Sequence, residues 1–327
     1  MIGIVGAGAW GTTLSHILSD KDDVVLYLRD KDLAKEIEEH RVNKKYLPEV
    51  NLSSRVRATS NIEEMSEAEQ VVIAVPSIGF RQAVVELSFL PSEITYVSVT
   101  KGLEQQTNLR MSEVITDADN RKTFESIAVL SGPNLAHEIA SGHPAATVIS
   151  STNEDVRLVL QKKFMTKNFR VYTSDDVLGC EVGGIAKNVV AIAVGIGDGF
   201  GYGDNAKAAI MTRSLAEITR LGIAMGANAS TFSGLAGIGD LIATCSSDLS
   251  RNRTVGYQLG KGQTLEEIRS SSHDIAEGVF SAASLASIAR QFNVDMPIVN
   301  STLKVIQQGY VTKSDVETLM TRPPSKE

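Results

Sequence analysis

A lysine lies in the middle of a long apolar run that offers it no polar surface. Lys187 is flanked by GGIA and NVVAIAV within the helix-like stretch 182–197. Burying an unpaired ammonium costs several kcal/mol, so such a lysine reaches solvent, meets an anion or becomes neutral. Buried lysines with lowered pKa values suit general acid catalysis near neutral pH. We therefore expect Lys187 to donate a proton, and a structural ion pair with a nearby carboxylate is the alternative.

Further polar side chains occur among glycines and apolar residues. Lys101 directly follows the strand-like run TYVSVT, and strand ends of this kind line the ligand crevice of doubly wound sheets. Asp240 lies in GLAGIGDLIATC, and Arg251 and Asn252 lie in SRNR. Such loops are typical of binding sites, although a helix–helix connection has a similar composition. Together the residue types indicate a small substrate with a phosphate, held by Arg and Asn, and a carbonyl or hydroxyl group.

Three glycines with the spacing G-x-G-x-x-G occur near the start of the chain, in GAGAWG. Gly6, Gly8 and Gly11 follow the apolar run 2–5 and precede a helix-like segment. Glycines at these positions allow a sharp turn, a close approach to a pyrophosphate and tight packing of the helix on the strand. The helix N-terminus would then face the phosphates with free N–H groups. The pattern predicts dinucleotide binding, and a glycine-rich packing turn is the alternative.

The end of the second predicted strand bears on the choice of cofactor. An NAD-specific site places an acid there to accept a hydrogen bond from the ribose 2′-hydroxyl, whereas this chain has Arg29 followed by Asp30. A guanidinium suits a 2′-phosphate. We therefore predict that NADPH is preferred or that NADH is also accepted. A solvated charge at the strand end is the alternative for Arg29.

Alternating strands and helices are predicted to position these residues in the first half of the chain. Apolar runs at 2–5, 24–28, 55–59, 70–75, 95–100 and 126–130 favour strands buried on both faces, hence a mostly parallel sheet. Helix-like segments between most of them indicate a doubly wound α/β domain over residues 1–178. After about Thr173 only helical patterns follow, which predicts an all-helical domain over 179–327. The apolar run 182–197 contains Lys187 and Asn188, so we expect a buried central helix rather than a membrane span.

Composition narrows the class of protein. The chain has 327 residues, enough for about two domains, and its net charge of −7 offers no basic surface for nucleic acid or for an anionic membrane. Cys180 and Cys245 form no C-x-x-C pair, so we expect two buried free thiols in a reducing compartment. No signal peptide is recognisable, and no histidines have metal-ligand spacing. We expect a cytoplasmic protein without a metal site.

Several blocks in order along the chain resemble one enzyme family. They are GAGAWG, VTKGLE, SGPNLAHEIASGHPAA, EVGGIAKNVVAIAVGIGDGFGYGDNAKAAIMTRSLAEI, GLAGIGDLIATC and SRNR. Together they closely resemble the NAD(P)-dependent glycerol-3-phosphate dehydrogenases, from Ile2 to about Tyr310. The resemblance implies a Rossmann domain followed by a helical domain of the 6-phosphogluconate dehydrogenase type, with NADPH or NADH as cofactor. It also implies interconversion of dihydroxyacetone phosphate and sn-glycerol 3-phosphate, supply of glycerophospholipid synthesis, and a homodimer.

The resemblance also assigns roles to matching residues. It implies that Lys187 is the catalytic acid/base, that Asp240 lies beside it, and that Lys101 contacts both substrate and cofactor. Further substrate contacts are implied at Gly132, Asn134, Ser250, Arg251 and Asn252. Cofactor contacts are implied at Gly6, Gly8, Ala9, Trp10, Gly11, Arg29, Lys101, Ala136, Arg251, Ile275 and Glu277. Asn134 departs from the bacterial pattern, which usually has Ser or Thr there, but an amide can still donate a hydrogen bond.

The expected chemistry is direct hydride transfer to the carbonyl carbon of dihydroxyacetone phosphate in a crevice between the domains. Lys187 would protonate the carbonyl oxygen, Asp240 would orient Lys187, and Lys101 would add positive charge near that oxygen. A related β-hydroxyacid or 6-phosphogluconate-type dehydrogenase is the first alternative, and it would need a site for a carboxylate. A redox sensor that binds the dinucleotide without turnover is the second, and it leaves Lys187 and Asp240 without a task.

Overall fold

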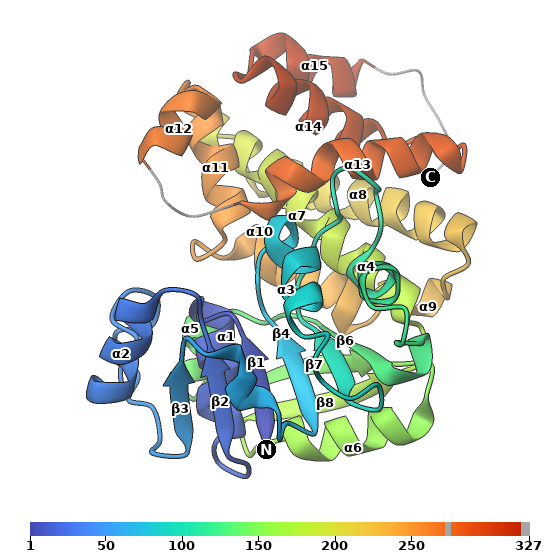
Figure 1. The fold of residues 1–327 in the computed structure, drawn as a ribbon. Helices are drawn as coiled ribbons and strands as arrows, with labels where there is room; N and C mark the ends of the chain where they lie inside the picture. Colours follow the sequence, from blue (N-terminus) through green and yellow to red (C-terminus); the bar gives the residue numbers. More distant parts are fainter. Residues whose placement is uncertain (272–275, 322–327) are drawn as a thin grey trace. The chain divides into compact units, whose positions relative to one another are not determined.

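Eight strands form one sheet in the computed structural model, which describes residues 1–271 and 276–321 (Figure 1). The strand order is β3-β2-β1-β4-β5-β6-β7-β8, and every neighbouring pair is parallel except β6 and β7. The order reverses between β1 and β4, which is where doubly wound sheets bind their ligands. The strands are β1 (Ile2–Val5), β2 (Val24–Tyr27), β3 (Val56–Thr59), β4 (Gln70–Ile73), β5 (Thr95–Ser98), β6 (Ile127–Ser131), β7 (Ala145–Ser150) and β8 (Phe169–Ser174).

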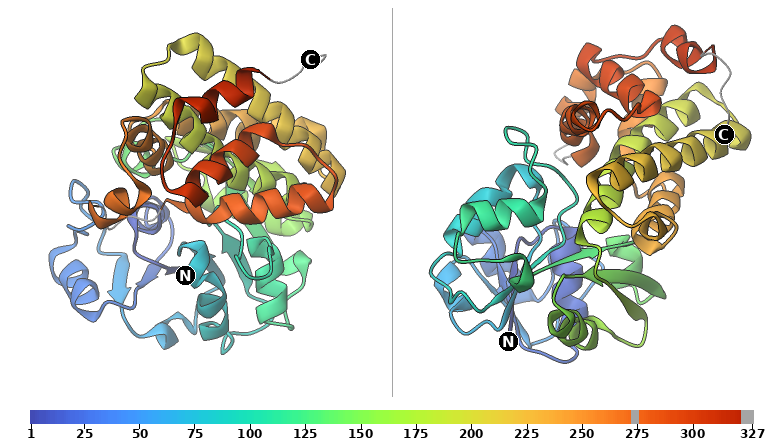
Figure 2. Two further views of the ribbon diagram at one scale, coloured as in Figure 1. Left: turned by 90° about the horizontal axis from the view of Figure 1, so that it is seen from above. Right: turned by 90° about the vertical axis from the view of Figure 1, so that its right-hand side faces the viewer.

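Helices cover both faces of this sheet, because successive strand residues point to opposite sides. Ile4 and Leu26 belong to one apolar cluster, with residues of α1, α2, α5 and α6, whereas Val5 and Val25 belong to another, with residues of α3 and α4. Figure 2 shows helices on either side of the strands. The helices are α1 (Ala9–Leu18), α2 (Lys31–His40), α3 (Phe80–Glu86), α4 (Met111–Ala118), α5 (Ala136–Ala140) and α6 (Glu154–Phe164).

The predicted architecture is confirmed, and the six predicted strands are present. Two strands, β7 and β8, were not predicted. β8 lies at the edge of the sheet, and polar side chains alternate with its apolar ones; β7 begins with two alanines. Both therefore lack the long run of large apolar residues that marks a strand buried on both faces.

By its contacts the chain divides into two units. The first comprises Met1–Glu104 and Leu109–Glu181, and the second comprises Gln105–Asn108 and Val182–Glu327. The boundary expected at residue 178 and the boundary at Glu181 both lie within α7 (Val177–Phe200). The described helices that follow α7 are α8 (Asp204–Met225), α9 (Ala229–Phe232), α10 (Asp240–Ser246), α11 (Arg251–Gly260), α12 (Leu265–Ser271), α13 (Glu277–Gln291), α14 (Pro297–Gln308) and α15 (Lys313–Met320).

Helix α7 is the buried central helix expected from the apolar run at 182–197. By length and composition it could cross a membrane, with a mean hydropathy of 1.6, but 89% of its most apolar stretch is buried inside the protein. Its residues Ile192 and Ile196 pack with Leu259 of α11 in an apolar cluster. The cysteines are also as expected: both are free and buried, and burial raises the pKa of each thiol to about 12.

A buried carboxyl group in the second unit predicts a pH-dependent stability. Glu217 accepts hydrogen bonds from the Ile298 and Val299 amides at the start of α14, at 3.0 and 3.5 Å. Burial raises the pKa of Glu217 to about 7. The nearby Asp295 also raises this pKa, whereas the two amides and Arg220 lower it. Because the folded-state pKa lies above the unfolded one, the protonated form of Glu217 favours the folded state. Its contribution to the free energy of unfolding is complete at acid pH and is lost as the pH rises through about 7.

We expect the free energy of unfolding to fall between pH 5 and pH 8 by an amount on the order of 3 kcal/mol from this group, since one pKa unit corresponds to about 1.4 kcal/mol. Glu217→Gln keeps an acceptor for the Ile298 amide but does not titrate, so it should flatten this dependence. Urea denaturation of both proteins at four pH values measures the difference. Parallel loss of stability in wild type and variant would contradict the assignment to Glu217.

Candidate active site

The glycine-rich loop follows β1 at the point where the strand order reverses. Gly6 has a φ of +106°, in the region that favours glycine. A Cβ on Gly11 would lie 1.9 Å from the Gly6 carbonyl oxygen, so only glycine lets α1 approach this closely. A Cβ on Gly8, in contrast, would meet no heavy atom within 4 Å. Gly8 therefore borders the open space that a pyrophosphate needs at the uncapped N-terminus of α1.

The side chains next to this loop differ in their surroundings. Ala9 is the first residue of α1, and the Trp10 ring contacts Phe169 edge to face, with ring centroids 6.3 Å apart. Trp10 is partly buried against the core, so its indole helps to anchor α1. The carbonyl oxygen of Ala136 accepts a hydrogen bond from Thr13 Oγ1 at 3.1 Å, which ties the start of α5 to α1.

Arg29 and Asp30, which together left the cofactor preference open, have separate tasks in the structure. A carboxylate oxygen of Asp30 accepts a hydrogen bond from the Leu33 amide at 3.0 Å and so caps α2. The Arg29 side chain is 59% exposed and forms an ion pair with Glu86, with 3.1 Å between Nη2 and Oε1. Both side chains are exposed: the Arg29 guanidinium is paired with the Glu86 carboxylate, and one carboxylate oxygen of Asp30 is engaged in the cap.

Three predicted residues of the first unit lie around the end of β6. Lys101 Nζ donates a hydrogen bond to the carbonyl oxygen of Gly132 at 2.9 Å, which brings two predicted residues together. Asn134 Nδ2 donates to Thr147 Oγ1 at 3.1 Å, and this hydroxyl in turn donates to the Ser131 carbonyl oxygen at 3.0 Å. The amide nitrogen of Asn134 must therefore face Thr147, and its buried Oδ1 has no hydrogen-bond partner within the described residues.

The predicted lysine of the second unit forms a buried cluster with Asp240 and Thr244. Lys187 Nζ lies 2.7 Å from Asp240 Oδ1 and 2.7 Å from Thr244 Oγ1. The Asp240 side chain is 1% exposed and that of Lys187 is 10% exposed, so the ammonium is not entirely enclosed. An ammonium has three N–H donors, and in the part of the chain that the structure describes two have partners. The third is available to a ligand.

The residues of the SRNR block serve mainly to hold helix ends. The Ser250 hydroxyl accepts a hydrogen bond from the Arg253 amide at 3.3 Å and caps α11. Asn252 is 8% exposed; its Nδ2 donates to Asn188 Oδ1 at 3.0 Å, and its Oδ1 accepts from the Gly278 amide at 2.9 Å. The Asn252 side-chain amide therefore links the starts of α11 and α13 to α7, a set of contacts that sequence reasoning did not predict.

One predicted cofactor residue lies at the start of α13, and another lies at the start of α11. Glu277 is the first residue of α13, whereas Ile275 lies outside the described residues. Arg251, the first residue of α11, is exposed, and no hydrogen bond or ion pair of its side chain occurs within residues 1–271 and 276–321. Ser250 and Asn252 are engaged in hydrogen bonds, whereas the Arg251 side chain has no partner within the described residues and is available to a phosphate.

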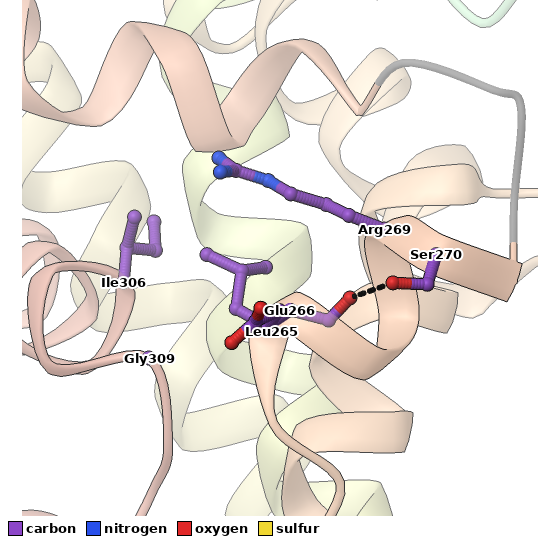
Figure 3. A pocket seen from close by; sticks show the side chains of 6 residues that line it. All are labelled: Leu265, Glu266, Arg269, Ser270, Ile306 and Gly309. Carbon is purple, nitrogen blue, oxygen red and sulfur yellow. Dashed lines mark hydrogen bonds between the residues drawn. The ribbon is translucent and has the colours of Figure 1, made fainter.

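Sequence reasoning missed Thr244, the second partner of Lys187. A signal was present, because Asp240 and Thr244 are four residues apart and side chains at this spacing share one face of a helix. A hollow elsewhere in the second unit contains none of the predicted residues (Figure 3). It is lined by Leu265, Glu266, Arg269, Ser270, Ile306 and Gly309.

Comparisons with family models, relatives and solved structures all identify the same enzyme family. The model for the N-terminal part of NAD-dependent glycerol-3-phosphate dehydrogenases matches residues 1–157, and the model for the C-terminal part matches residues 176–317. A Corynebacterium kroppenstedtii protein named glycerol-3-phosphate dehydrogenase (NAD(P)+) is 46% identical over 100% of this chain and 99% of its own. The crystal structure of glycerol-3-phosphate dehydrogenase from Coxiella burnetii superposes with a TM-score of 0.93 at 32% identity, covering 98% of both chains.

Proposed function

The chain belongs to the NAD-dependent glycerol-3-phosphate dehydrogenases, and from this premise we propose how its residues perform the reaction. The enzyme interconverts dihydroxyacetone phosphate and sn-glycerol 3-phosphate with NAD(P)H. The observation that carries the proposal is the cluster of Lys187, Asp240 and Thr244, which holds two donors of the ammonium and leaves the third for the substrate.

Lys187 acts as the general acid when the ketone is reduced. When bound, NAD(P)H would supply a hydride for the C2 carbonyl carbon. Negative charge then develops on the carbonyl oxygen, and Lys187 transfers a proton from Nζ to that oxygen to give the C2 hydroxyl. The Asp240 carboxylate and the Thr244 hydroxyl, each 2.7 Å from Nζ, fix the direction of the remaining N–H bond. In the reverse direction the neutral amine accepts the hydroxyl proton.

The N-terminus of α11 binds the substrate phosphate. Arg251 contributes a guanidinium that has no partner within the described residues and that matches the geometry of a phosphate. The Ser250 hydroxyl accepts a hydrogen bond as the helix cap and can still donate its own proton. The Asn252 amide has a second Nδ2 hydrogen to offer besides the one on Asn188. These contacts use binding energy remote from the reacting carbon to position it.

Residues of the first unit complete the substrate contacts. Lys101, held on the Gly132 carbonyl oxygen, adds positive charge near the developing oxyanion. The Oδ1 of Asn134, which has no partner in the described part of the chain, accepts a hydrogen bond from a substrate hydroxyl, which differs from the donor role expected at this position. Both side chains are attached to loops that follow strands of the sheet, where open α/β sheets bind ligands.

The cofactor is NAD(P)H, and the proposed contacts lie around the glycine-rich loop. The pyrophosphate would be held by the segment Gly6, Gly8, Ala9, Trp10 and Gly11, a placement that the open space at Gly8 supports. Further contacts are proposed at Lys101, Ala136, Arg251, Ile275 and Glu277. Arg29 binds the 2′-phosphate of NADPH after exchanging its ion pair with Glu86 for that anion.

We expect the purified protein to oxidise NADPH when supplied with dihydroxyacetone phosphate, followed at 340 nm, with a higher kcat/KM than for NADH. Arg29→Ala should lower kcat/KM for NADPH by about tenfold and leave that for NADH nearly unchanged, since charge-assisted hydrogen bonds contribute about 1.5–3 kcal/mol. A 2-oxo acid serves as the control substrate and should be turned over much more slowly. An unchanged NADPH/NADH ratio in the variant would remove Arg29 from the cofactor site, and preference for the 2-oxo acid would refute the substrate assignment.

Cellular context follows from the reaction and from the family. The substrate is a small phosphorylated molecule, and we propose that the product supplies glycerophospholipid synthesis. We also propose that the enzyme works in the cytoplasm as a homodimer. Neither nucleic acid nor insertion into a membrane has a part in this proposal.

A further inference from the structure

A buried asparagine that lies 36 residues after Ala7 in the sequence contacts the glycine-rich loop. Asn43 is fully buried, and its Nδ2 lies 2.8 Å from the Ala7 carbonyl oxygen and 2.8 Å from Thr12 Oγ1. Its Oδ1 accepts a hydrogen bond from the Tyr46 amide at 3.3 Å. Both amide hydrogens and the amide oxygen of Asn43 are therefore engaged, and two of these bonds reach the loop or the first turn of α1.

The segment that carries Asn43 is itself held in place. Its ends are joined by a hydrogen bond from the Leu52 amide to the Arg41 carbonyl oxygen at 2.7 Å. Within it, the Asn43 carbonyl oxygen accepts from the Leu47 amide at 2.8 Å. Leu47 and Leu52 are buried in the core of the first unit. These contacts hold the Asn43 side-chain amide in a fixed position.

The Ala7 carbonyl oxygen receives a second donor. Thr12 Oγ1, which accepts from Asn43, donates its own proton to that oxygen at 3.3 Å. In a planar trans peptide the C=O and the following N–H point in opposite directions. Two donors on the Ala7 oxygen therefore direct the Gly8 N–H away from Asn43 and Thr12, and they polarise it as a donor.

We propose that Asn43, together with Thr12, is a positioning residue that orients and polarises the Ala7–Gly8 peptide for the pyrophosphate of the cofactor. The inference rests on the proposed placement of the pyrophosphate at Gly8, where a Cβ would meet no heavy atom within 4 Å. It predicts an effect on every ligand that carries the pyrophosphate, whatever its 2′-substituent or nicotinamide. It predicts no direct effect on dihydroxyacetone phosphate.

The test measures ligand affinity in the full chain. Asn43→Ala should raise the Kd of NADPH, NADH and ADP-ribose by a common factor of about tenfold, and Thr12→Val by about threefold, within the usual range for single hydrogen bonds. At saturating cofactor, kcat and the KM for dihydroxyacetone phosphate should remain near the wild-type values. If Asn43→Ala does not fold, Thr12→Val decides: an unchanged Kd for ADP-ribose would overturn the proposal.

Asn153→Ala is the matched control for stability. Asn153 caps α6 in the same unit by accepting hydrogen bonds from the Asp155 and Val156 amides at 2.9 and 3.4 Å. Its loss should lower the Tm without changing any Kd. Wild-type affinity in folded Asn43→Ala, or an equal loss of affinity in Asn153→Ala, would overturn the role of Asn43. If Gly8→Ala also binds normally, the placement of the pyrophosphate itself is wrong.

Discussion

Replacing Lys187 by alanine should lower kcat for reduction of dihydroxyacetone phosphate by about two to four orders of magnitude, the usual contribution of a positioned general acid. The carbonyl oxygen would lose its proton donor, and Asp240 would remain as a buried carboxylate without its cation. The Kd of NADPH should stay close to the wild-type value, because Lys187 is not among the proposed cofactor contacts and the glycine-rich loop belongs to the first unit. Absorbance at 340 nm at saturating substrate and cofactor gives kcat, and fluorescence titration gives the Kd.

Lys207→Ala is the control for simple loss of an ion pair in the same unit. Lys207 Nζ lies 3.1 Å from Asp198 Oδ1, and the two side chains are 25% and 11% exposed, so a partly buried pair is broken without touching the Lys187 cluster. Its kcat should remain within about twofold of wild type, because it supplies no proton to the substrate. A folded Lys187→Ala variant with near-normal kcat would refute general acid catalysis by this residue.

Substitutions at two glycines of the same loop should affect different properties, cofactor affinity in one case and stability in the other. Gly8→Ala should leave the Tm unchanged, because the residue has an ordinary φ of −67° and its Cβ would meet no heavy atom within 4 Å. The new methyl group would occupy the space that we assign to the pyrophosphate. We expect the Kd of NADPH to rise by about ten- to a hundredfold, since hydrogen bonds to a charged group contribute about 1.5–3 kcal/mol.

Gly11→Ala should instead destabilise the fold. Its Cβ would lie 1.9 Å from the Gly6 carbonyl oxygen, so α1 must move away from the loop at a cost of about 1–3 kcal/mol or more. Thermal unfolding of both variants without ligand, together with cofactor titration, separates the two effects. A Gly8→Ala protein with wild-type affinity would contradict the assigned pyrophosphate position, and an unchanged Tm in Gly11→Ala would contradict the packing of α1.

Much of the fold could be predicted because its signals are local. Five of the predicted strands are short runs buried on both faces, and α7 is an apolar stretch too long to be a strand. The sixth, β3 at the edge of the sheet, has an exposed Arg57 among buried residues. β8 escaped prediction because Arg170 and Tyr172 alternate with buried Phe169 and Val171 at the edge of the sheet. The antiparallel pairing of β6 and β7 had no local signal either, because strand direction is set by how the chain returns to the sheet.

The residue types of the site could be predicted more fully than their partners. Lys187 stood out because no polar helix face accommodates it; the family resemblance placed Asp240 beside it, and the structure adds Thr244 from α10 as a second partner. Asn252 was expected on the phosphate alone, yet its amide bridges Asn188 and Gly278. These partners are distant in sequence, with 64 positions separating Asn188 from Asn252. Asn43 was missed for the same reason. The spacing of residues within the glycine-rich motif does not show which distant side chain donates hydrogen bonds to that loop.

The central claim is that the Lys187 ammonium delivers its proton directly to the carbonyl oxygen of the substrate. The most direct measurement is the distance between these two atoms in a crystal structure with NADP+ and a dihydroxyacetone phosphate analogue bound. We predict about 2.6–3.2 Å between Nζ and that oxygen, with Asp240 and Thr244 still on the ammonium. An Nζ lying beyond hydrogen-bond reach of the oxygen, with no bridging water, would contradict the account.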